Sequence, residues 1–151
     1  MHIIEDTRNK IGKHEEKNEW FKENDITVIR SKVPFGDYTL PPKVAVDTKK
    51  DMEEIAQNIS AEHKRFVGEC VNARDAGCKL YILVENECNI TSIDQVHHWV
   101  NPQCIHHPKC IQGPRLEKAM KTIQERYGCS FLFCNPKDSA DIITKILARG
   151  E

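Results

Sequence analysis

The stretch that decides the fold is residues 36–49, which read GDYTLPPKVAVDTK. The opening glycine and acid are typical of a turn. The segments YTL (38–40) and KVAVDTK (43–49) predict the two arms of a hairpin, with Pro41 and Pro42 at its reversal. The second arm places an acid and a lysine on an otherwise apolar strand, where charges are unfavourable unless they are paired or bind a metal ion.

Side chains alternate between the two faces of a strand, so Asp47 and Lys49 are expected to stand side by side. Asp37, at the start of the neighbouring arm, is expected to lie close to Asp47. Two carboxylates repel each other unless a proton or a cation intervenes, and Mg²⁺ prefers oxygen ligands. An ammonium beside such an ion can orient a water molecule or offset charge growing on a phosphate. The pattern therefore predicts metal-assisted hydrolysis of a phosphodiester.

The same residues have a plainer interpretation. Asp-x-Lys alone occurs by chance in many proteins, and Gly-Asp is an ordinary turn. The context favours the catalytic interpretation, because the acid precedes a hairpin, the Asp-x-Lys lies on its second arm, and a helical pattern follows at once.

The composition is typical of one globular domain covering residues 1–151, with 39% hydrophobic residues. No window is apolar enough to cross a bilayer, and the first residues lack the apolar core of a signal peptide. We therefore expect an intracellular protein, cytoplasmic or nucleoid-associated, with no membrane partner and with its seven cysteines reduced. A net charge of −1 gives no global basic field, so a nucleic acid would need a local basic strip or a bound cation.

Hydrophobic periodicity predicts strands and helices in alternation after the hairpin. Near-continuous apolar runs at 80–85 and 130–134 are typical of strands covered on both faces. Together the elements predict a three-layer α-β-α sandwich with a mixed central sheet. The further strands are expected at 2–6 and 26–30, and the helices at 14–24, 51–74 with an interruption near 62–63, 93–100, 115–127, and from a cap at Asp138 or Ser139 to about 149.

The motif at 36–49 resembles that of the XPF-type nuclease domain, in the PD-(D/E)xK endonuclease superfamily. That family's pattern is Gly-Asp, a spacer, Glu-Arg-Lys, three residues and Asp. In this chain Gly36, Asp37 and Lys49 match the pattern, Asp47 stands for the glutamate, and Glu53 falls where the last aspartate is expected. The resemblance extends from about residue 3 to 147.

The resemblance implies a restriction-endonuclease-like fold, dependence on Mg²⁺ or Mn²⁺, and cleavage of branched, flapped or forked DNA in repair or recombination. It implies that Asp37 and Asp47 ligate the metal, that Lys49 positions the attacking water, and that Glu53 supports them from the first turn of the next helix. The family's early Asp-x-Arg corresponds to Asp6-Thr7-Arg8, so Asp6 is expected to assist with the metal.

Members of this family pair their nuclease domains, so a homodimer or heterodimer is expected. The chain ends where relatives often continue into a helix-hairpin-helix module, so we expect a stand-alone form in which branch selectivity is either lacking or supplied by a second subunit. Thr48 replaces the family's arginine and removes a positive charge, although strand parity points its side chain away from Asp47 and Lys49. The principal rival interpretation is a non-catalytic DNA-binding or scaffolding module that keeps the nuclease fold.

A second rival is an interaction protein organised by zinc. Zinc takes four nitrogen or sulfur ligands, and the loop at 97–110 is rich in both. The spacing is not a usual finger spacing, and the alternative is an exposed polar loop. The candidate ligands are Cys104, His106, His107 and Cys110, with His97 and His98 just upstream.

Several basic residues are candidates for contacts with DNA phosphates, which set register and salt dependence rather than sequence preference. Ordinary solvated helix faces carry the same residue types. The candidates are Arg8, Lys64, Arg65, Arg115 and Lys118, with Lys121 on the same predicted helix as the last two.

Overall fold

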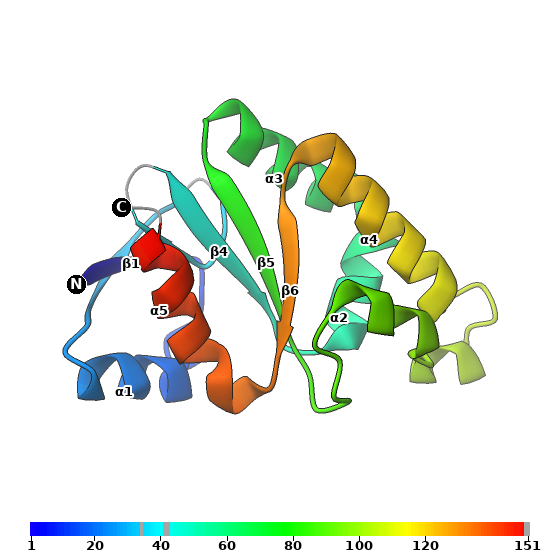
Figure 1. Cartoon of the computed structure of the whole chain (residues 1–151), viewed down its shortest axis with the longest axis horizontal. Helices are drawn as coiled ribbons and strands as arrows, with labels where there is room; N and C mark the ends of the chain where they lie inside the picture. The colour runs from blue at the N-terminus through cyan, green and yellow to red at the C-terminus, as the bar shows by residue number, and fades with distance from the viewer. Residues whose placement is uncertain (34, 41–42, 150–151) are drawn as a thin grey trace.

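The computed structural model describes residues 1–33, 35–40 and 43–149, and within them the chain forms one mixed six-stranded sheet between helices (Figure 1). The reversal predicted at Pro41 and Pro42 lies outside the described residues. The strand order is β2-β1-β3-β4-β5-β6. The strands are β1 (His2–Asp6), β2 (Thr27–Ser31), β3 (Tyr38–Leu40), β4 (Val44–Lys49), β5 (Lys79–Glu85) and β6 (Ser130–Cys134).

The direction of β3 sets the position of the functional residues. It runs antiparallel to both of its neighbours, β1 and β4. The pairs β1–β2, β4–β5 and β5–β6 are parallel. The start of β3 therefore lies at the carboxyl ends of β1 and β4. This topology brings the beginning of the predicted hairpin beside the end of the first strand and the end of the Asp-x-Lys strand.

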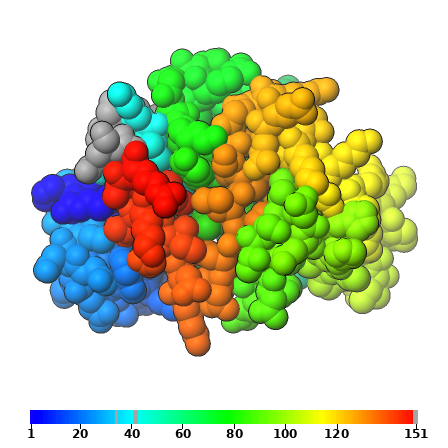
Figure 2. Space-filling view, in the orientation of Figure 1, coloured from blue at the N-terminus to red at the C-terminus, as the bar shows by residue number. Residues whose placement is uncertain are grey.

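The helices cover both faces of the sheet and confirm the predicted three-layer α/β fold (Figure 1). One face packs against α2 (Met52–Ile59), α3 (His63–Asp75) and α4 (Gly113–Tyr127). The other packs against α1 (Glu15–Glu23) and α5 (Ser139–Arg149), whose surfaces lie side by side in Figure 2. Short 3-10 helices connect the larger elements: η1 (Ile93–His98), η2 (Pro102–Ile105) and η3 (Pro136–Asp138).

Every residue of β4 is buried, because this strand lies inside the sheet with helices on both sides. Ala45 belongs to the core beneath α2, α3 and α4, and Val46 belongs to the core beneath α1 and α5. By strand alternation, Asp47 and Lys49 face the α3 side, and Thr48 faces the α1 side. The two charged side chains are thus buried in the sheet and need local compensation.

The helical region predicted over 51–74 is two helices, separated at the expected interruption. At the end of α2 the Ala56 carbonyl accepts both the Ser60 N–H, over 3.0 Å, and the Ser60 hydroxyl, over 2.6 Å. Asp51 begins α2 by accepting a hydrogen bond from Glu54 N over 2.8 Å. Within the described ranges, no helix is both long and apolar enough to span a membrane.

Candidate active site

The turn at Gly36-Asp37 ties three strands together. Asp37 N donates to Val46 O over 2.9 Å, and Asp6 N donates to Asp37 O over 2.8 Å. Gly36 has a φ of +77°, and a Cβ there would lie 3.1 Å from Val46 O. Glycine is therefore required both by the backbone conformation and by the close approach of β4.

Asp47 and Lys49 form a buried ion pair. Lys49 Nζ lies 2.8 Å from Asp47 Oδ2, and the two side chains are only 10% and 8% exposed. Lys49 Nζ also lies 5.8 Å from the centroid of the Phe66 ring, on the α3 side of the sheet. The predicted sharing of one strand face is confirmed by this contact.

The ion pair leaves Asp47 near the midpoint of its titration at neutral pH. Burial raises the pKa of Asp47 to about 7, against the opposing attraction of Lys49, and the negative charge of Asp37 raises it further. Burial alone would lower the pKa of Lys49, but the attraction of Asp47 outweighs it and leaves that pKa raised. Lys49 is therefore a cation at neutral pH, beside an acid whose pKa lies near neutrality.

Asp37 has the opposite electrostatic environment. Burial acts to raise its pKa, but hydrogen bonds from Thr48 and the positive charge of Lys13 hold that pKa below its usual value. Thr48 donates both its backbone N–H, over 3.0 Å, and its hydroxyl, over 2.7 Å, to Asp37 Oδ2. Strand parity predicts that the Thr48 side chain points away from Asp47 and Lys49, but it does not predict this contact with Asp37.

His14 lies behind Asp37 on the α1 side. Its ring is buried 5.4 Å from that of Tyr38, and its Nε2 lies 3.9 Å from Asp37 Oδ2. Burial lowers the pKa of His14 to about 4, so the ring is neutral at physiological pH. Sequence reasoning did not find this residue, because nothing local in the sequence marks it as a neighbour of Asp37.

Asp6 lies at the same edge of the sheet but is held by Arg8. Arg8 N donates to one carboxylate oxygen over 3.1 Å, and Arg8 Nε donates to the other over 2.5 Å. Arg8 Nη2 also donates to Val33 O over 3.0 Å, which fixes the guanidinium. Both carboxylate oxygens of Asp6 are therefore engaged within the chain.

Most of these residues line a cavity of about 300 Å³, here named the central cavity. The structure brings together six of the predicted residues in its lining: Asp6, Arg8, Asp37, Asp47, Lys49 and Arg65. It is also lined by Lys13, Thr48, Glu54 and Glu69, which the sequence analysis did not assign to the site.

Glu69 joins α3 to the turn. Its Oε1 accepts a hydrogen bond from Gly36 N over 2.8 Å, and its negative charge contributes to raising the pKa of Asp47. Glu54 lines the cavity and Glu53 does not, so the acid of the first turn of α2 that faces the site is Glu54 rather than the predicted Glu53. Successive helix residues point about 100° apart, so the Asp51 cap sets which one of the two faces the site.

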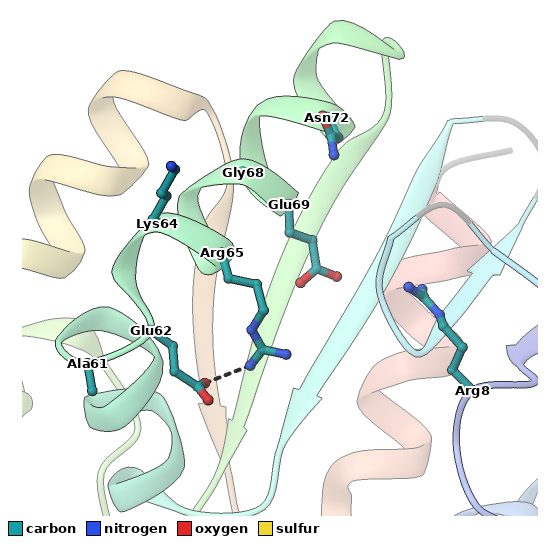
Figure 3. A pocket seen from close by; sticks show the side chains of 8 residues that line it. All are labelled: Arg8, Ala61, Glu62, Lys64, Arg65, Gly68, Glu69 and Asn72. Carbon is teal, nitrogen blue, oxygen red and sulfur yellow. Dashed lines mark hydrogen bonds and ion pairs between the residues drawn. The ribbon is translucent and has the colours of Figure 1, made fainter.

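A larger cavity of about 810 Å³, here named the α3 cavity, adjoins the central cavity and shares Arg8, Arg65 and Glu69 with it. Figure 3 shows Arg65 and Glu69 extending from α3 into the space that faces Arg8. Lys64 also lines this cavity, and Arg65 is paired with Glu62 over 2.6 Å. Three of the predicted phosphate contacts therefore lie beside the candidate site.

Arg115 and Lys118 do not share this location. They line a different cavity, between the first turn of α3 and the exposed side of α4.

The residues fit an oxygen-ligated ion held by two carboxylates. Across residues 1–33, 35–40 and 43–149, no group of three or more histidine, cysteine or acidic side chains is arranged to hold a metal. Asp6 is engaged by Arg8, which leaves Asp37 and Asp47 as the two available aspartates of the central cavity, beside Glu54 and Glu69. In the same described ranges, Asp47 Oδ2 has no hydrogen-bond donor beyond its ion-pair contact with Lys49. Mg²⁺ is commonly bound through one or two carboxylates, with water and substrate phosphate completing its shell.

Among the described residues, the predicted zinc ligands are not gathered into a metal site. Cys104 and Cys110 are joined by a disulfide, with Cα atoms 5.4 Å apart, so neither offers a thiolate. His106 and His107 are exposed, and the described residues contain no cluster of three metal-binding side chains. Asn101 Nδ2 holds the loop by donating to Ile111 O over 3.0 Å. The expectation of reduced thiols fails for this pair and holds for the five cysteines that are free.

A mixed sheet between helical layers, with two aspartates and a lysine at the meeting point of β1, β3 and β4, defines a restriction-endonuclease-like domain. The chain matches the ERCC4 domain over residues 6–146 and belongs to that family. The predicted resemblance to the XPF-type nuclease domain is confirmed.

Solved structures of an archaeal member share the fold. XPF from Aeropyrum pernix superposes with a TM-score of 0.71 at 17% identity, covering 99% of this chain and 64% of that one. The same protein in complex with DNA gives a TM-score of 0.70 at 17% identity, covering 98% and 64%. The chain thus spans about two thirds of the length of these structures. A comparison with curated proteins finds no match.

Proposed function

We propose that this protein is a metal-dependent endonuclease that hydrolyses phosphodiester bonds in DNA and prefers branched, flapped or forked substrates. The observation that carries the proposal is the pairing, in one central cavity, of an ionised Asp37 with the buried Asp47–Lys49 pair. Membership of the ERCC4 domain family and the likeness to XPF, one of whose structures is a complex with DNA, support the substrate class. A role in DNA repair or recombination, and pairing of two nuclease domains, belong to the same proposal.

Asp37 and Asp47 would hold the ion, which we infer to be Mg²⁺ or Mn²⁺. When bound, such an ion polarises a phosphoryl oxygen and lowers the pKa of its bound water. Lys49 has the position to orient the attacking water and to stabilise negative charge that develops on the phosphate. Thr48 fixes the direction of the Asp37 carboxylate, so that its other oxygen remains available to the cavity.

The basic side chains around the α3 cavity would position the DNA substrate. Lys64 is exposed there, and Arg8 and Arg65 are each anchored to an acid. Anchored guanidinium groups lose less conformational freedom when they meet a phosphate, which favours a defined register of the DNA strand.

A non-catalytic module that retains the fold is the alternative function. It predicts that the protein binds DNA but does not cleave it with any divalent ion. The intact set of Asp37, Asp47 and Lys49, with the distinct ionisation of its two acids, favours catalysis.

The test incubates labelled duplex, flap, fork and single-stranded DNA with Mg²⁺ or Mn²⁺. Asp47→Ala and Lys49→Ala are each expected to lower the cleavage rate about a hundredfold or more, as expected when a group acting on the transition state is removed. Asp141→Ala and Lys145→Ala are matched controls, because they remove an acid and a lysine paired over 2.5 Å on α5, away from the site.

Thermal unfolding of each variant separates a loss of catalysis from a loss of folding. Wild-type cleavage rates in folded Asp47→Ala and Lys49→Ala would refute the assignment of these residues. DNA binding by the wild type without cleavage under either ion would favour the non-catalytic alternative.

A further inference from the structure

A second basic cavity, of about 400 Å³, lies between the first turn of α3 and α4, and we name it the α4 groove. Its floor is formed by apolar and aromatic side chains, Ala119, Ile123 and Tyr127. Arg115, Lys118 and Arg126 stand along one side. No acidic side chain of the described residues lines it.

The basic residues form a line because of their spacing on α4. Positions 115, 118, 122 and 126 are separated by three and four residues and therefore lie on one helix face, with Thr122 between the cations. Eleven residues at 1.5 Å each give a line about 16 Å long. One DNA strand carries a phosphate about every 3.4 Å along a duplex, and less often when extended, so the line can meet several phosphates.

The three cations that line the α4 groove form no ion pairs within the described part of the chain. Among the described residues, Arg115, Lys118 and Arg126 have no acidic partner within ion-pair distance. Lys121, which lies on the same helix but outside the groove, is paired with both Asp94 and Glu117 over 2.7 Å. The unpaired cations are thus the ones that face the groove.

The α4 groove adjoins the surface that leads to the candidate site. His63 lines it, and the next two residues, Lys64 and Arg65, line the α3 cavity on the other side of the same helical turn. α3 and α4 pack together over the same face of the sheet (Figure 1). A strand that leaves the central cavity across the first turn of α3 therefore reaches α4.

We propose that the α4 groove binds a single-stranded DNA segment that flanks the cleavage point, with phosphates along Arg115, Lys118 and Arg126 and a base or sugar against Tyr127. Single strands are bound where a basic groove follows the backbone and an aromatic ring offers a stacking surface. A duplex exposes its phosphates but not its base faces, so its bases cannot stack on the apolar floor of the groove. The proposal rests on the proposed function and names the unpaired arm of a branched substrate as the segment recognised.

The test measures binding without cleavage, by fluorescence anisotropy of a labelled oligo-dT strand in the presence of a chelator. The variant Arg115→Gln, Lys118→Gln, Arg126→Gln removes the line of charge. The control Lys22→Gln, Lys137→Gln, Arg149→Gln removes the same charge from exposed residues of α1, η3 and α5. Both are compared with wild type over a range of salt concentrations.

The groove variant is expected to bind at least about tenfold more weakly and to lose about two units of slope in the plot of log affinity against log salt, since each single-strand phosphate contact contributes about 0.7. The control is expected to match wild type. Tyr127→Ala is expected to weaken binding with no change in this slope, because it removes stacking and no charge.

Equal affinity and slope for wild type and the groove variant would overturn the inference. So would equal losses in the control, an equal loss for a blunt duplex, or stronger competition by a poly-glutamate peptide than by oligo-dT. These outcomes differ from a failure of the proposed function, in which the groove variant shows the expected binding defect while wild type cleaves no substrate with Mg²⁺ or Mn²⁺.

Discussion

Replacement of Lys49 by methionine tests the electrostatic basis of the candidate site. The change keeps the length of the side chain but removes the ammonium 2.8 Å from Asp47 Oδ2. Both side chains are about nine-tenths buried, so the carboxylate left behind has little access to water. Removal of one partner from a buried ion pair destabilises a protein by about 3–5 kcal/mol, and we expect a loss in that range above neutral pH.

The size of the loss depends on pH in a direction that the structure fixes. Burial raises the pKa of Asp47 to about 7 even with Lys49 present, and the lysine acts to lower it. Without the lysine the pKa of Asp47 rises further. A group whose pKa is higher in the folded state contributes stability at low pH, and that contribution is lost as the pH rises through the folded pKa. The deficit of Lys49→Met should therefore be larger at about pH 9 than at about pH 6.

Urea unfolding of a double-mutant cycle provides the measurement. Asp47→Asn and Lys49→Met should each destabilise, and the double variant should recover about 2–3 kcal/mol relative to the sum, because it leaves no unpaired buried charge. The same cycle at Asp141 and Lys145, a pair that is largely solvent-exposed, should show a coupling below about 1 kcal/mol. Additive losses of stability at positions 47 and 49, or a deficit independent of pH, would refute the idea that Asp47 and Lys49 stabilise each other's buried charges.

Two further predictions concern the α1 side of the site. Thr48→Val should destabilise the protein by about 1.5–3 kcal/mol and raise the pKa of Asp37, because it removes a 2.7 Å hydrogen bond to the carboxylate. Thr48→Ser is the control, since it keeps the hydroxyl. Carboxyl NMR titration measures the pKa of Asp37, and an unchanged value in Thr48→Val would contradict the prediction. The pKa of His14 falls to about 4 in the folded state, so its contribution to stability is present above its unfolded pKa of about 6.5 and is lost as the pH falls. After allowance for solvent screening, the wild type should lose about 1–2 kcal/mol of stability through His14 by about pH 5. His14→Gln lacks this group, so its stability should fall less than that of the wild type between about pH 7 and pH 5. Identical pH profiles of unfolding for His14→Gln and wild type would exclude this role.

Local patterns in the sequence were sufficient to predict the fold. Strand alternation placed Asp47 and Lys49 on one face, and the apolar runs of β5 and β6 correctly indicated strands covered on both sides. These features depend on the backbone period alone, which a sequence displays directly. The break between α2 and α3 also appeared in the sequence, as an interruption of the apolar stripe.

The contacts between segments were not predictable in the same way. Strand parity gives the face of Thr48 but not the position of the turn that brings Asp37 to its hydroxyl. Glu69 lies 33 residues from Gly36 along the chain, and only the packing of α3 brings them together. The sequence predicted free thiols at Cys104 and Cys110, and only the fold of the loop reveals that the two are joined.

The two carboxylates are stabilised by different neighbours on the two faces of the sheet, although the charge of Asp37 also raises the pKa of Asp47. On the α1 side, Thr48 stabilises the charged form of Asp37. On the α3 side, Lys49 opposes the effect of burial on Asp47, whereas Glu69 adds to it. The threonine that replaces the arginine of the family's pattern therefore contacts the candidate site directly, because its hydrogen bond stabilises the charged form of Asp37. An acid ionised across the physiological range, beside one that titrates near neutral pH, gives the site a fixed negative charge and a separate group able to exchange a proton.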